Sequence, residues 1–262
     1  MTEKQHILAY RDLPRPAIFA HRGSCTHAPE NTLAAFELAI QEHADGLELD
    51  VKLSADGEVV VMHDDNVDRT TNGSGSVNRM TLAELKQLDA GSKFDPAYHG
   101  ERIPTLAEVF EAIGSQVFIN VEVKNYTSPL DDLPDKVIAL VKEYNLENSV
   151  MLSSFNVIAL IRARSLLPKI PLGLITVKGL ADLTLRSKLV RLSPLLAFHP
   201  HYLDVTPEMI QATHRAGTRI HPYTVNQPES MRQLFVRGVD GIFSDDIVSA
   251  RQIRTEVEES HH

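Results

Sequence analysis

The chain has 262 residues, 43% of them hydrophobic, and its formal net charge of −9 comes from 26 basic and 35 acidic side chains. A chain of this length and composition can bury a large core as one domain. The acidic balance, without any basic run, argues against a nucleic-acid partner. Residues 1–16 are polar, and no apolar run approaches the roughly 20 residues of a membrane span, so we expect a cytoplasmic protein without stable membrane insertion.

Apolar runs of strand length recur along the chain and alternate with helical patterns. We predict strands at 18–23, 46–53, 117–124, 149–155, 171–177, 195–199, 219–225 and 241–244. We predict helices at 32–43, 105–113, 133–144, 156–167, 180–191, 207–216, 228–237 and 246–257. Repeated βα units imply parallel strands, and eight of them imply closure. The fold prediction is therefore α/β, a single (β/α)8 TIM barrel over residues 1–260.

Helix starts carry clear signals in the last third of the chain. Thr206-Pro207 and Asn226-Gln227-Pro228 both supply a polar cap followed by a proline in the first turn. These signals place the helices that begin at 207 and 228.

The second βα unit is interrupted by an insertion. Residues 54–57 indicate a turn into a hairpin partner strand at 59–64, and a polar stretch of about 64–102 follows, with a short helix near 81–88. Only the helix at 105–113 then completes the unit. Long loops after barrel strands lie at the catalytic end, so we expect this insertion to cover the site.

Two of the predicted strands carry charged side chains on one face. Alternation places together Glu48, Asp50, Lys52, Asn120, Glu122 and Lys124. Burying unpaired carboxylates costs several kcal/mol each, so the three acids need cations between them. A salt-bridge network with the two lysines is one solution. Because three acids face two bases, a divalent cation such as Mg²⁺ or Ca²⁺ gives the better charge balance.

Short motifs, in a fixed order from residue 21 to about 246, resemble those of the glycerophosphodiester phosphodiesterase family, most closely its short cytosolic bacterial members. The motifs are His21-Arg22-Gly23, Pro29-Glu30-Asn31-Thr32, Glu48-Leu49-Asp50-Val51, His63-Asp64, Asp68-Arg69-Thr70-Thr71, Leu88-Asp89-Ala90-Gly91, Ile103-Pro104-Thr105-Leu106, Glu122-Val123-Lys124, Tyr223-Thr224-Val225-Asn226 and Gly238-Val239-Asp240-Gly241-Ile242. The resemblance implies hydrolysis of a small glycerophosphodiester to glycerol 3-phosphate and an alcohol.

The resemblance also implies roles for individual residues. It names His21 and His63 as general acid and base without assigning which is which, and it implies a divalent cation held by Glu48, Asp50 and Glu122. A cation suits the chemistry, because negative charge grows on the phosphate oxygens during attack.

Three further residues would contact the substrate. Arg22 and Lys124 can hold phosphate oxygens, and Arg can bind two at once. Tyr223 stands where many relatives carry Trp, which bears on substrate fit rather than on the reaction. The nucleophile is open at this stage: either water attacks directly, or a neighbouring glycerol hydroxyl forms a cyclic phosphate that water then opens.

Two other functions are weighed against this one. A phosphodiesterase for lysophospholipids or phosphoinositides would need an apolar rim, which the polar insertion disfavours. A non-catalytic ligand-binding barrel would be expected to lack at least one of five residues, yet all are present: His21, His63, Glu48, Asp50 and Glu122.

Several residues with reactive or polar side chains can be explained by structural roles rather than catalytic ones. Cys25 is the only cysteine and cannot form an intrachain disulfide, and a small loop residue is favoured over a thiol nucleophile. Glu30 and Asn31 would cap the first helix or brace His21. Four other histidines lack motif support, although the first two could line an alcohol pocket: His199, His201, His214 and His221.

Overall fold

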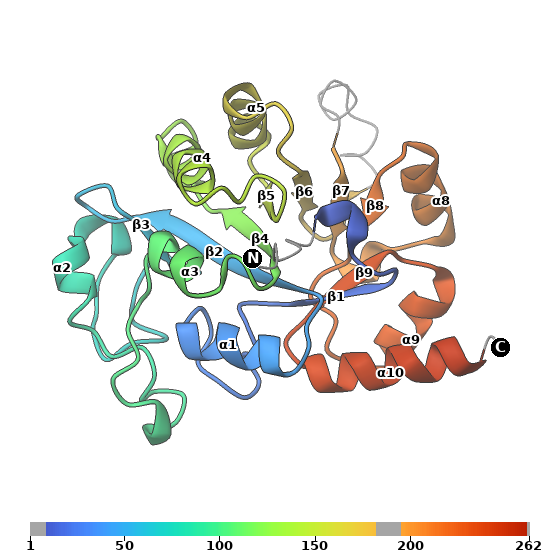
Figure 1. Ribbon diagram of the computed structural model, residues 1–262, viewed down its shortest axis with the longest axis horizontal. Helices are drawn as coiled ribbons and strands as arrows, with labels where there is room; N and C mark the ends of the chain where they lie inside the picture. Colours follow the sequence, from blue (N-terminus) through green and yellow to red (C-terminus); the bar gives the residue numbers. More distant parts are fainter. Residues whose placement is uncertain (1–8, 182–194, 261–262) are drawn as a thin grey trace, which may run out of the picture.

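The computed structural model describes residues 9–181 and 195–260. Within them, eight parallel strands form one curved sheet (Figure 1). They are β1 (Ala17–Ala20), β2 (Gly46–Leu53), β4 (Phe118–Val123), β5 (Val150–Ser154), β6 (Leu172–Thr176), β7 (Ala197–Pro200), β8 (Arg219–Ile220) and β9 (Gly241–Ser244). Their hydrogen-bonded order is β8-β7-β6-β5-β4-β2-β1-β9.

Backbone hydrogen bonds close the sheet between its two ends. Asp240 N donates to Ile220 O at 3.0 Å, Phe243 N to Pro222 O at 3.0 Å, and Val225 N to Phe243 O at 2.8 Å. The strand predicted over 219–225 is thus only two residues long as β8. The residues that follow it, up to Val225, still form backbone hydrogen bonds with β9. The predicted TIM barrel is confirmed.

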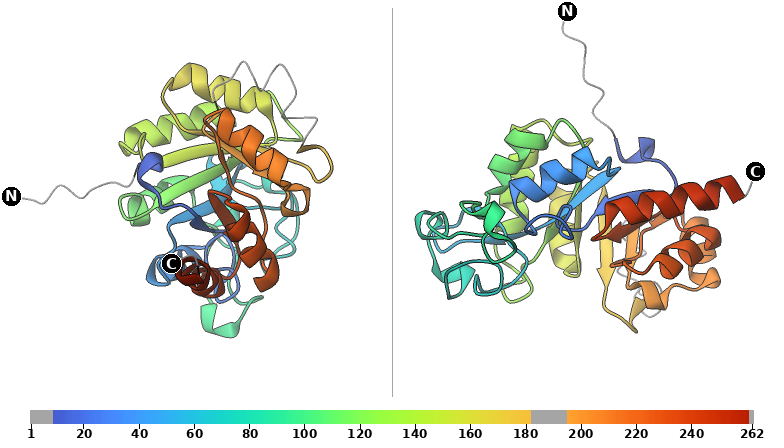
Figure 2. Two further views of the ribbon diagram at one scale, coloured as in Figure 1. Left: turned by 90° about the vertical axis from the view of Figure 1, so that its right-hand side faces the viewer. Right: turned by 90° about the horizontal axis from the view of Figure 1, so that it is seen from below.

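Helices surround the barrel and cover the outer face of its strands (Figures 1 and 2). They are α1 (Leu33–Gln41), α3 (Leu106–Ile113), α4 (Leu133–Glu143), α5 (Val157–Leu166), α8 (Pro207–Arg215), α9 (Pro228–Arg237) and α10 (Ile247–Ser260). All were expected within a few residues. The helix predicted at 180–191 lies almost wholly outside the described residues. None of the helices in the described ranges combines the length and the hydrophobicity needed to cross a lipid bilayer.

Local capping explains most helix starts. The side chains of Thr32, Thr105 and Thr206 each accept a hydrogen bond from the backbone N–H three residues later. The cap expected at Asn226 is wrong: α9 begins after Gln227, whose side chain makes no capping bond. Asn226 instead bonds Asp245, which follows the neighbouring strand.

Alternation along β2 separates the core from the barrel interior. Leu47, Leu49 and Val51 pack into the main hydrophobic core, while Glu48 and Asp50 face inward. The parallel register of β2 with β4 pairs Asp50 with Glu122. The fold therefore brings carboxylates from two neighbouring strands together.

The insertion forms a lobe at one side of the barrel (Figures 1 and 2). β3 (Val59–Val61) pairs antiparallel with β2, and η2 (Val77–Arg79), α2 (Leu82–Leu85) and η3 (Pro96–Tyr98) follow. The lobe has its own small core: Val60, Met62, Val67, Val77, Leu85, Ala90 and Ile103. Its helix is shorter than predicted. The chain instead enters a loop in which the Asp89 carboxylate accepts several backbone N–H bonds.

Aromatic side chains pack at the amino end of the barrel. A short 3-10 helix, η1 (Tyr10–Asp12), lies across it, and Tyr10 packs against Phe118 and His221 with ring centroids 5.7 and 5.9 Å apart. The Arg219 guanidinium lies 4.7 Å from the Tyr10 ring centroid. Polar chemistry is therefore gathered at the opposite, carboxyl end of the strands, as in other barrels of this type.

Candidate active site

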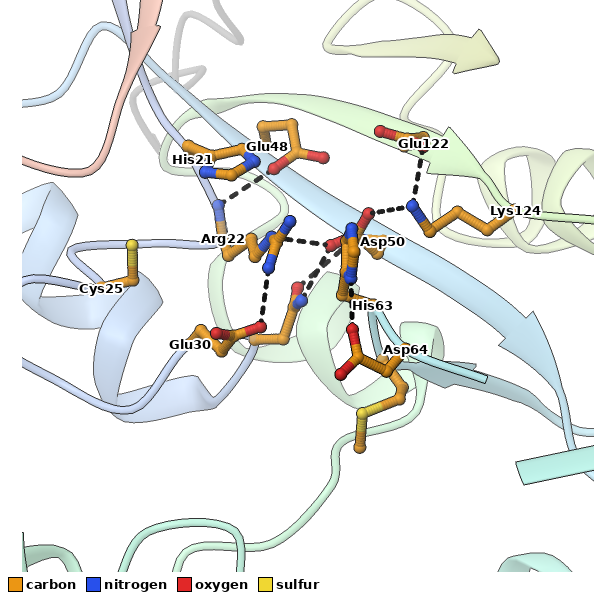
Figure 3. A network of polar contacts seen from close by, with 12 residues as sticks. His21, Arg22, Cys25, Glu30, Glu48, Asp50, His63, Asp64, Glu122 and Lys124 are labelled. Atoms are coloured by element: carbon orange, nitrogen blue, oxygen red, sulfur yellow. Dashed lines mark hydrogen bonds and ion pairs between the residues drawn. The ribbon is translucent and has the colours of Figure 1, made fainter. Parts of the chain in front are cut away.

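The first site residues leave the sheet in a sharp turn. The strand predicted to continue through Gly23 ends at Ala20, because Arg22 and Gly23 have φ angles of 58° and 85°. A Cβ on Gly23 would lie 2.7 Å from the Ala35 carbonyl carbon, so only glycine fits there. The turn directs the side chains of His21 and Arg22 toward the barrel mouth (Figure 3).

Asp245 orients His21. Its carboxylate Oδ1 lies 2.7 Å from His21 Nδ1, and it follows β9, whereas His21 follows β1. Burial would raise the pKa of Asp245, but hydrogen bonds from His21, Cys25 and Asn226 lower it to about 2. The anionic carboxylate can only accept at this contact, so Nδ1 is the donor, and Nε2 is the ring nitrogen that can take up a proton whenever the imidazole is neutral. Sequence reasoning missed Asp245, although a carboxylate directly after a barrel strand was a usable signal.

Three carboxylates lie together deeper in the mouth. Ligand oxygens of Glu48, Asp50 and Glu122 lie within 4.8 Å of one another, and Glu48 and Asp50 are buried (Figure 3). Burial alone would raise the pKa of Asp50, but Lys124 and Arg22 lower it to about 2. Asp50 Oδ1 lies 3.4 Å from Lys124 Nζ, and Oδ2 lies 3.3 Å from Arg22 Nε.

Glu48 is the least satisfied of the three acids. Its Oε2 accepts the Arg22 backbone N–H at 3.0 Å, but within the described residues Oε1 accepts no hydrogen bond. Burial, with the charges of Asp50 and Glu122, raises its pKa well above the ordinary value. A buried carboxyl oxygen without a partner, beside two more carboxyl groups, fits a hard divalent cation, which prefers oxygen ligands. The residues present therefore fit Mg²⁺ or Ca²⁺.

Lys124 and Tyr126 hold the third acid. Lys124 Nζ donates to Glu122 Oε1 at 3.1 Å, and the Tyr126 hydroxyl donates to the same oxygen at 2.5 Å. Burial would lower the pKa of Lys124, yet Glu122 and Asp50 raise it, so the ammonium stays charged. Lys52 does not join this network: its Nζ bonds Asp65 of the insertion at 2.5 Å. The second cation beside the acids is instead Arg22.

His63 is held in the same way as His21, by a carboxylate on Nδ1. The Asp64 Oδ1 lies 2.6 Å away, and Asp64 also accepts from Arg69 Nε at 2.7 Å (Figure 3). Arg69 in turn binds both Glu30 oxygens, at 2.6 and 2.8 Å. Burial lowers the pKa of His63, and Arg22 and Lys124 act in the same direction, although Asp50 opposes them. The insertion therefore reaches the site through Asp64, which contacts His63, and through Arg69, which joins Asp64 to Glu30.

Replacing Arg69 tests this link. In Arg69→Gln, the Asp64 carboxylate loses its cation and interacts with His63 alone, which favours the protonated imidazole. We expect the ionisation of His63 in the pH profile of kcat/KM to move to higher pH by about half to one unit. Arg79→Gln, at an exposed residue of the same insertion, is the matched control. Superimposable profiles for Arg69→Gln and the wild type would contradict the link.

A small cavity lies inside the barrel mouth, lined from most of the strands around it. It is lined by His21, Glu48, Asn120, Glu122, Ile175, His199, Tyr223 and Phe243. The Tyr223 hydroxyl donates to Thr176 O at 2.8 Å, which fixes its ring at the rim. His199 is buried, and burial lowers its pKa to about 3, so it is neutral.

The other histidines without motif support lie elsewhere. His201 caps the 3-10 helix η4 (Tyr202–Asp204), His214 bonds Asp240 at 2.7 Å, and His221 lies beneath His199 with ring centroids 5.5 Å apart. None of these three lines the cavity.

The roles expected for Glu30 and Asn31 are wrong. Thr32 caps α1, and Asn31 holds Asp50 rather than His21, with its Nδ2 donating to Oδ2 at 2.9 Å. Glu30 binds Arg22 and Arg69. Cys25 donates its thiol to Asp245 at 3.2 Å, and burial together with Asp245 raises the pKa of the thiol, as expected for a residue that is not a nucleophile.

Two carboxylate-held imidazoles lie beside buried acids and cations at the carboxyl end of the TIM barrel, the end at which enzymes of this fold carry their active sites. The sequence profile of the glycerophosphoryl diester phosphodiesterase family matches residues 21–249. The chain belongs to this family, and it is a phosphoric diester hydrolase that acts on glycerophosphodiesters.

Relatives support the assignment over most of the chain. A glycerophosphodiester phosphodiesterase of Caldanaerobacter subterraneus subsp. tengcongensis is 43% identical over 233 residues, which cover 87% of this chain and 93% of that protein. One from Bacillus altitudinis is 37% identical over 92% of this chain and 98% of its own length. An Oleispira antarctica phosphodiesterase, solved with the product sn-glycerol-3-phosphate, is 33% identical with a TM-score of 0.78, covering 94% of this chain and 97% of that one.

Proposed function

We propose that the enzyme hydrolyses glycerophosphodiesters to glycerol 3-phosphate and an alcohol, with a divalent cation and with His21 and His63 as the two proton-transfer groups. The observation that carries the proposal is the matched pair of carboxylate-held imidazoles, His21 with Asp245 and His63 with Asp64, beside the three acids. The product bound to the Oleispira antarctica relative supports the choice of glycerol 3-phosphate.

The acids would hold the cation, and the bases would hold the phosphate. Glu48, Asp50 and Glu122 supply only oxygen donors, which suits Mg²⁺ and Ca²⁺. Such an ion, when bound, neutralises the charge that grows on the nonbridging phosphate oxygens. Arg22 and Lys124 already lie beside the acids and would contact the same anionic group.

We assign the proton transfers by position. His21 has an anionic partner at Nδ1 and, among residues 9–181 and 195–260, no hydrogen bond at Nε2, so it would accept a proton from the nucleophile, either water or the neighbouring glycerol hydroxyl. His63 lies beside the insertion with 30% of its side chain exposed, so it would protonate the leaving alcohol where that alcohol can escape to solvent. Tyr223 at the cavity rim would shape the space for the substrate.

A coupled assay for glycerol 3-phosphate tests the proposal. Glycerophosphocholine and glycerophosphoethanolamine are offered to enzyme stripped of metal and then restored with Mg²⁺ or Ca²⁺. Choline release is compared separately between glycerophosphocholine and a lysophosphatidylcholine, because the phosphate product of the lysophospholipid keeps its acyl chain and is not glycerol 3-phosphate. We expect release from the two water-soluble diesters only after metal is restored. Equal rates in chelator would refute the metal, and preference for the lysophospholipid would support the lipid phosphodiesterase instead.

A further inference from the structure

A second group of metal-ligating atoms lies on the other side of His21. His21 Nδ1, Cys25 Sγ and an Asp245 carboxylate oxygen lie within 4.8 Å of one another. Asp245 Oδ1 is 2.7 Å from Nδ1 and 3.2 Å from Sγ. Figure 3 shows Cys25 on the side of His21 away from Glu122, so this cluster is separate from the three acids.

We propose that His21, Cys25 and Asp245 form an inhibitory site for a thiophilic divalent cation such as Zn²⁺. Zn²⁺ binds imidazole nitrogen, thiolate sulfur and carboxylate oxygen, and a tetrahedral site with three protein ligands keeps its fourth position for water. Mg²⁺ and Ca²⁺ prefer oxygen and do not compete for a thiolate. The two clusters would therefore select different ions in one molecule.

Hydrogen bonds fix the position of Asp245 in the cluster, and the cluster is accessible from solvent. Asn226 Nδ2 donates to the other Asp245 oxygen at 2.5 Å, and Thr26 Oγ1 donates to the Asp245 carbonyl at 2.8 Å, which fix the carboxylate. The side chains of His21 and Asp245 are 18% and 30% exposed, so an entry path exists.

The charge and proton balance favour a divalent cation. A thiolate and a carboxylate carry two negative charges, which match one Zn²⁺. Burial and the neighbouring Asp245 raise the pKa of the thiol, so the free thiol is protonated and loses its proton to solvent when the ion binds. Binding therefore strengthens as pH rises and weakens as pH falls.

Binding would invert the tautomer of His21. Without the ion, a carboxylate at Asp245 accepts from Nδ1, so in the neutral imidazole Nε2 carries the lone pair. With Zn²⁺ on Nδ1, the remaining proton of the neutral imidazole moves to Nε2, which then has no lone pair for an incoming proton. Inhibition by this route rests on the proposed role of His21 as a base, whereas binding itself does not.

Cobalt provides a direct readout, because Co²⁺ replaces Zn²⁺ and absorbs in the near ultraviolet when bound by thiolate. Cys25 is the only cysteine, so any such band in this chain reports that residue. The full chain, with excess Mg²⁺ to occupy the oxygen site, is titrated with Co²⁺ and compared with Cys25→Ser and Cys25→Ala. Melting curves of the two variants confirm that they fold.

We expect a saturable thiolate band at one ion per chain in the wild type and none in either variant. A wild type without the band, or a band at one ion per two chains, which indicates bridging between molecules, would overturn the site. This result stands apart from turnover: failure to release glycerol 3-phosphate would overturn the proposed function and leave the cobalt band intact.

Inhibition is then measured with Zn²⁺ under excess Mg²⁺, each protein relative to its own zinc-free rate. We expect the half-inhibitory Zn²⁺ concentration to be about tenfold or more higher in Cys25→Ser than in the wild type, because one ligand is lost. Chelation should restore the rate. Equal zinc sensitivity in the two proteins, with a cobalt band in the wild type, would show that the ion binds without inhibiting and would overturn the inhibitory role.

Discussion

Glu48→Gln and Glu122→Gln should each lower kcat by about a hundredfold or more while the barrel stays folded. Each change conserves volume and removes one anionic oxygen from the group of three acids. For Glu48, the effect on activity and the effect on stability should have opposite directions. Its pKa is raised in the folded state by burial and the neighbouring acids, so above the ordinary pKa of a glutamate its charge opposes folding. The neutral amide should therefore melt no lower than the wild type at neutral pH in the absence of metal.

Activity and melting temperature are measured on the same samples, with and without added metal. Glu143→Gln, at an exposed position on α4, is the matched control and should behave as the wild type. Undiminished turnover of Glu48→Gln, or of metal-stripped wild type, would rule out a metal held by these acids. A melting temperature that falls together with activity would instead assign the carboxylate a structural role.

A substrate with a nitrophenolate leaving group should rescue His63→Ala and leave His21→Ala inactive. A stable leaving anion needs no proton, so the loss of the general acid matters less with this substrate. Loss of either histidine should lower the rate on an unactivated diester by roughly a hundredfold to ten-thousandfold. Only the residue that serves as the acid should recover on the activated one.

Each variant is assayed with one activated and one unactivated diester, and the ratio of the two losses is compared. Rescue of His21→Ala alone would reverse the assignment. Equal losses on both substrates for both variants would mean that neither imidazole is the proton donor. Binding of glycerol 3-phosphate by each variant, measured separately, controls for a collapsed site.

Sequence pattern predicted the parts of the site that depend on local geometry. The alternation along β2 placed Glu48 and Asp50 on one face, and the parallel β2–β4 pairing then brought Glu122 to them. Threonine caps located helix starts for the same reason, because a cap bonds a backbone group only three residues away.

Contacts between segments that are distant in the sequence could not be predicted from strand alternation and local caps. Asn31 binds Asp50 and Asn226 binds Asp245, although both asparagines stand where a helix cap was a sound local expectation. A polar side chain near a helix start can bond either its own helix or a neighbouring strand end, and only the three-dimensional arrangement decides. The position at which β1 ends was predicted wrongly, because no residue before 21 indicates the left-handed turn at Arg22 and Gly23.

The contact between His21 and Asp245 joins residues 224 positions apart, one after the first strand and one after the last. A ribosome adding roughly 5–20 residues per second needs about 10–45 seconds to reach the second after making the first. From the synthesis of Glu122 onward, about 6–25 seconds of that time, the nascent chain carries both histidines and all three acids but lacks the carboxylate that orients His21. Hydrolytic activity would thus begin only once the final strand has docked, so a truncated or stalled chain stays inert.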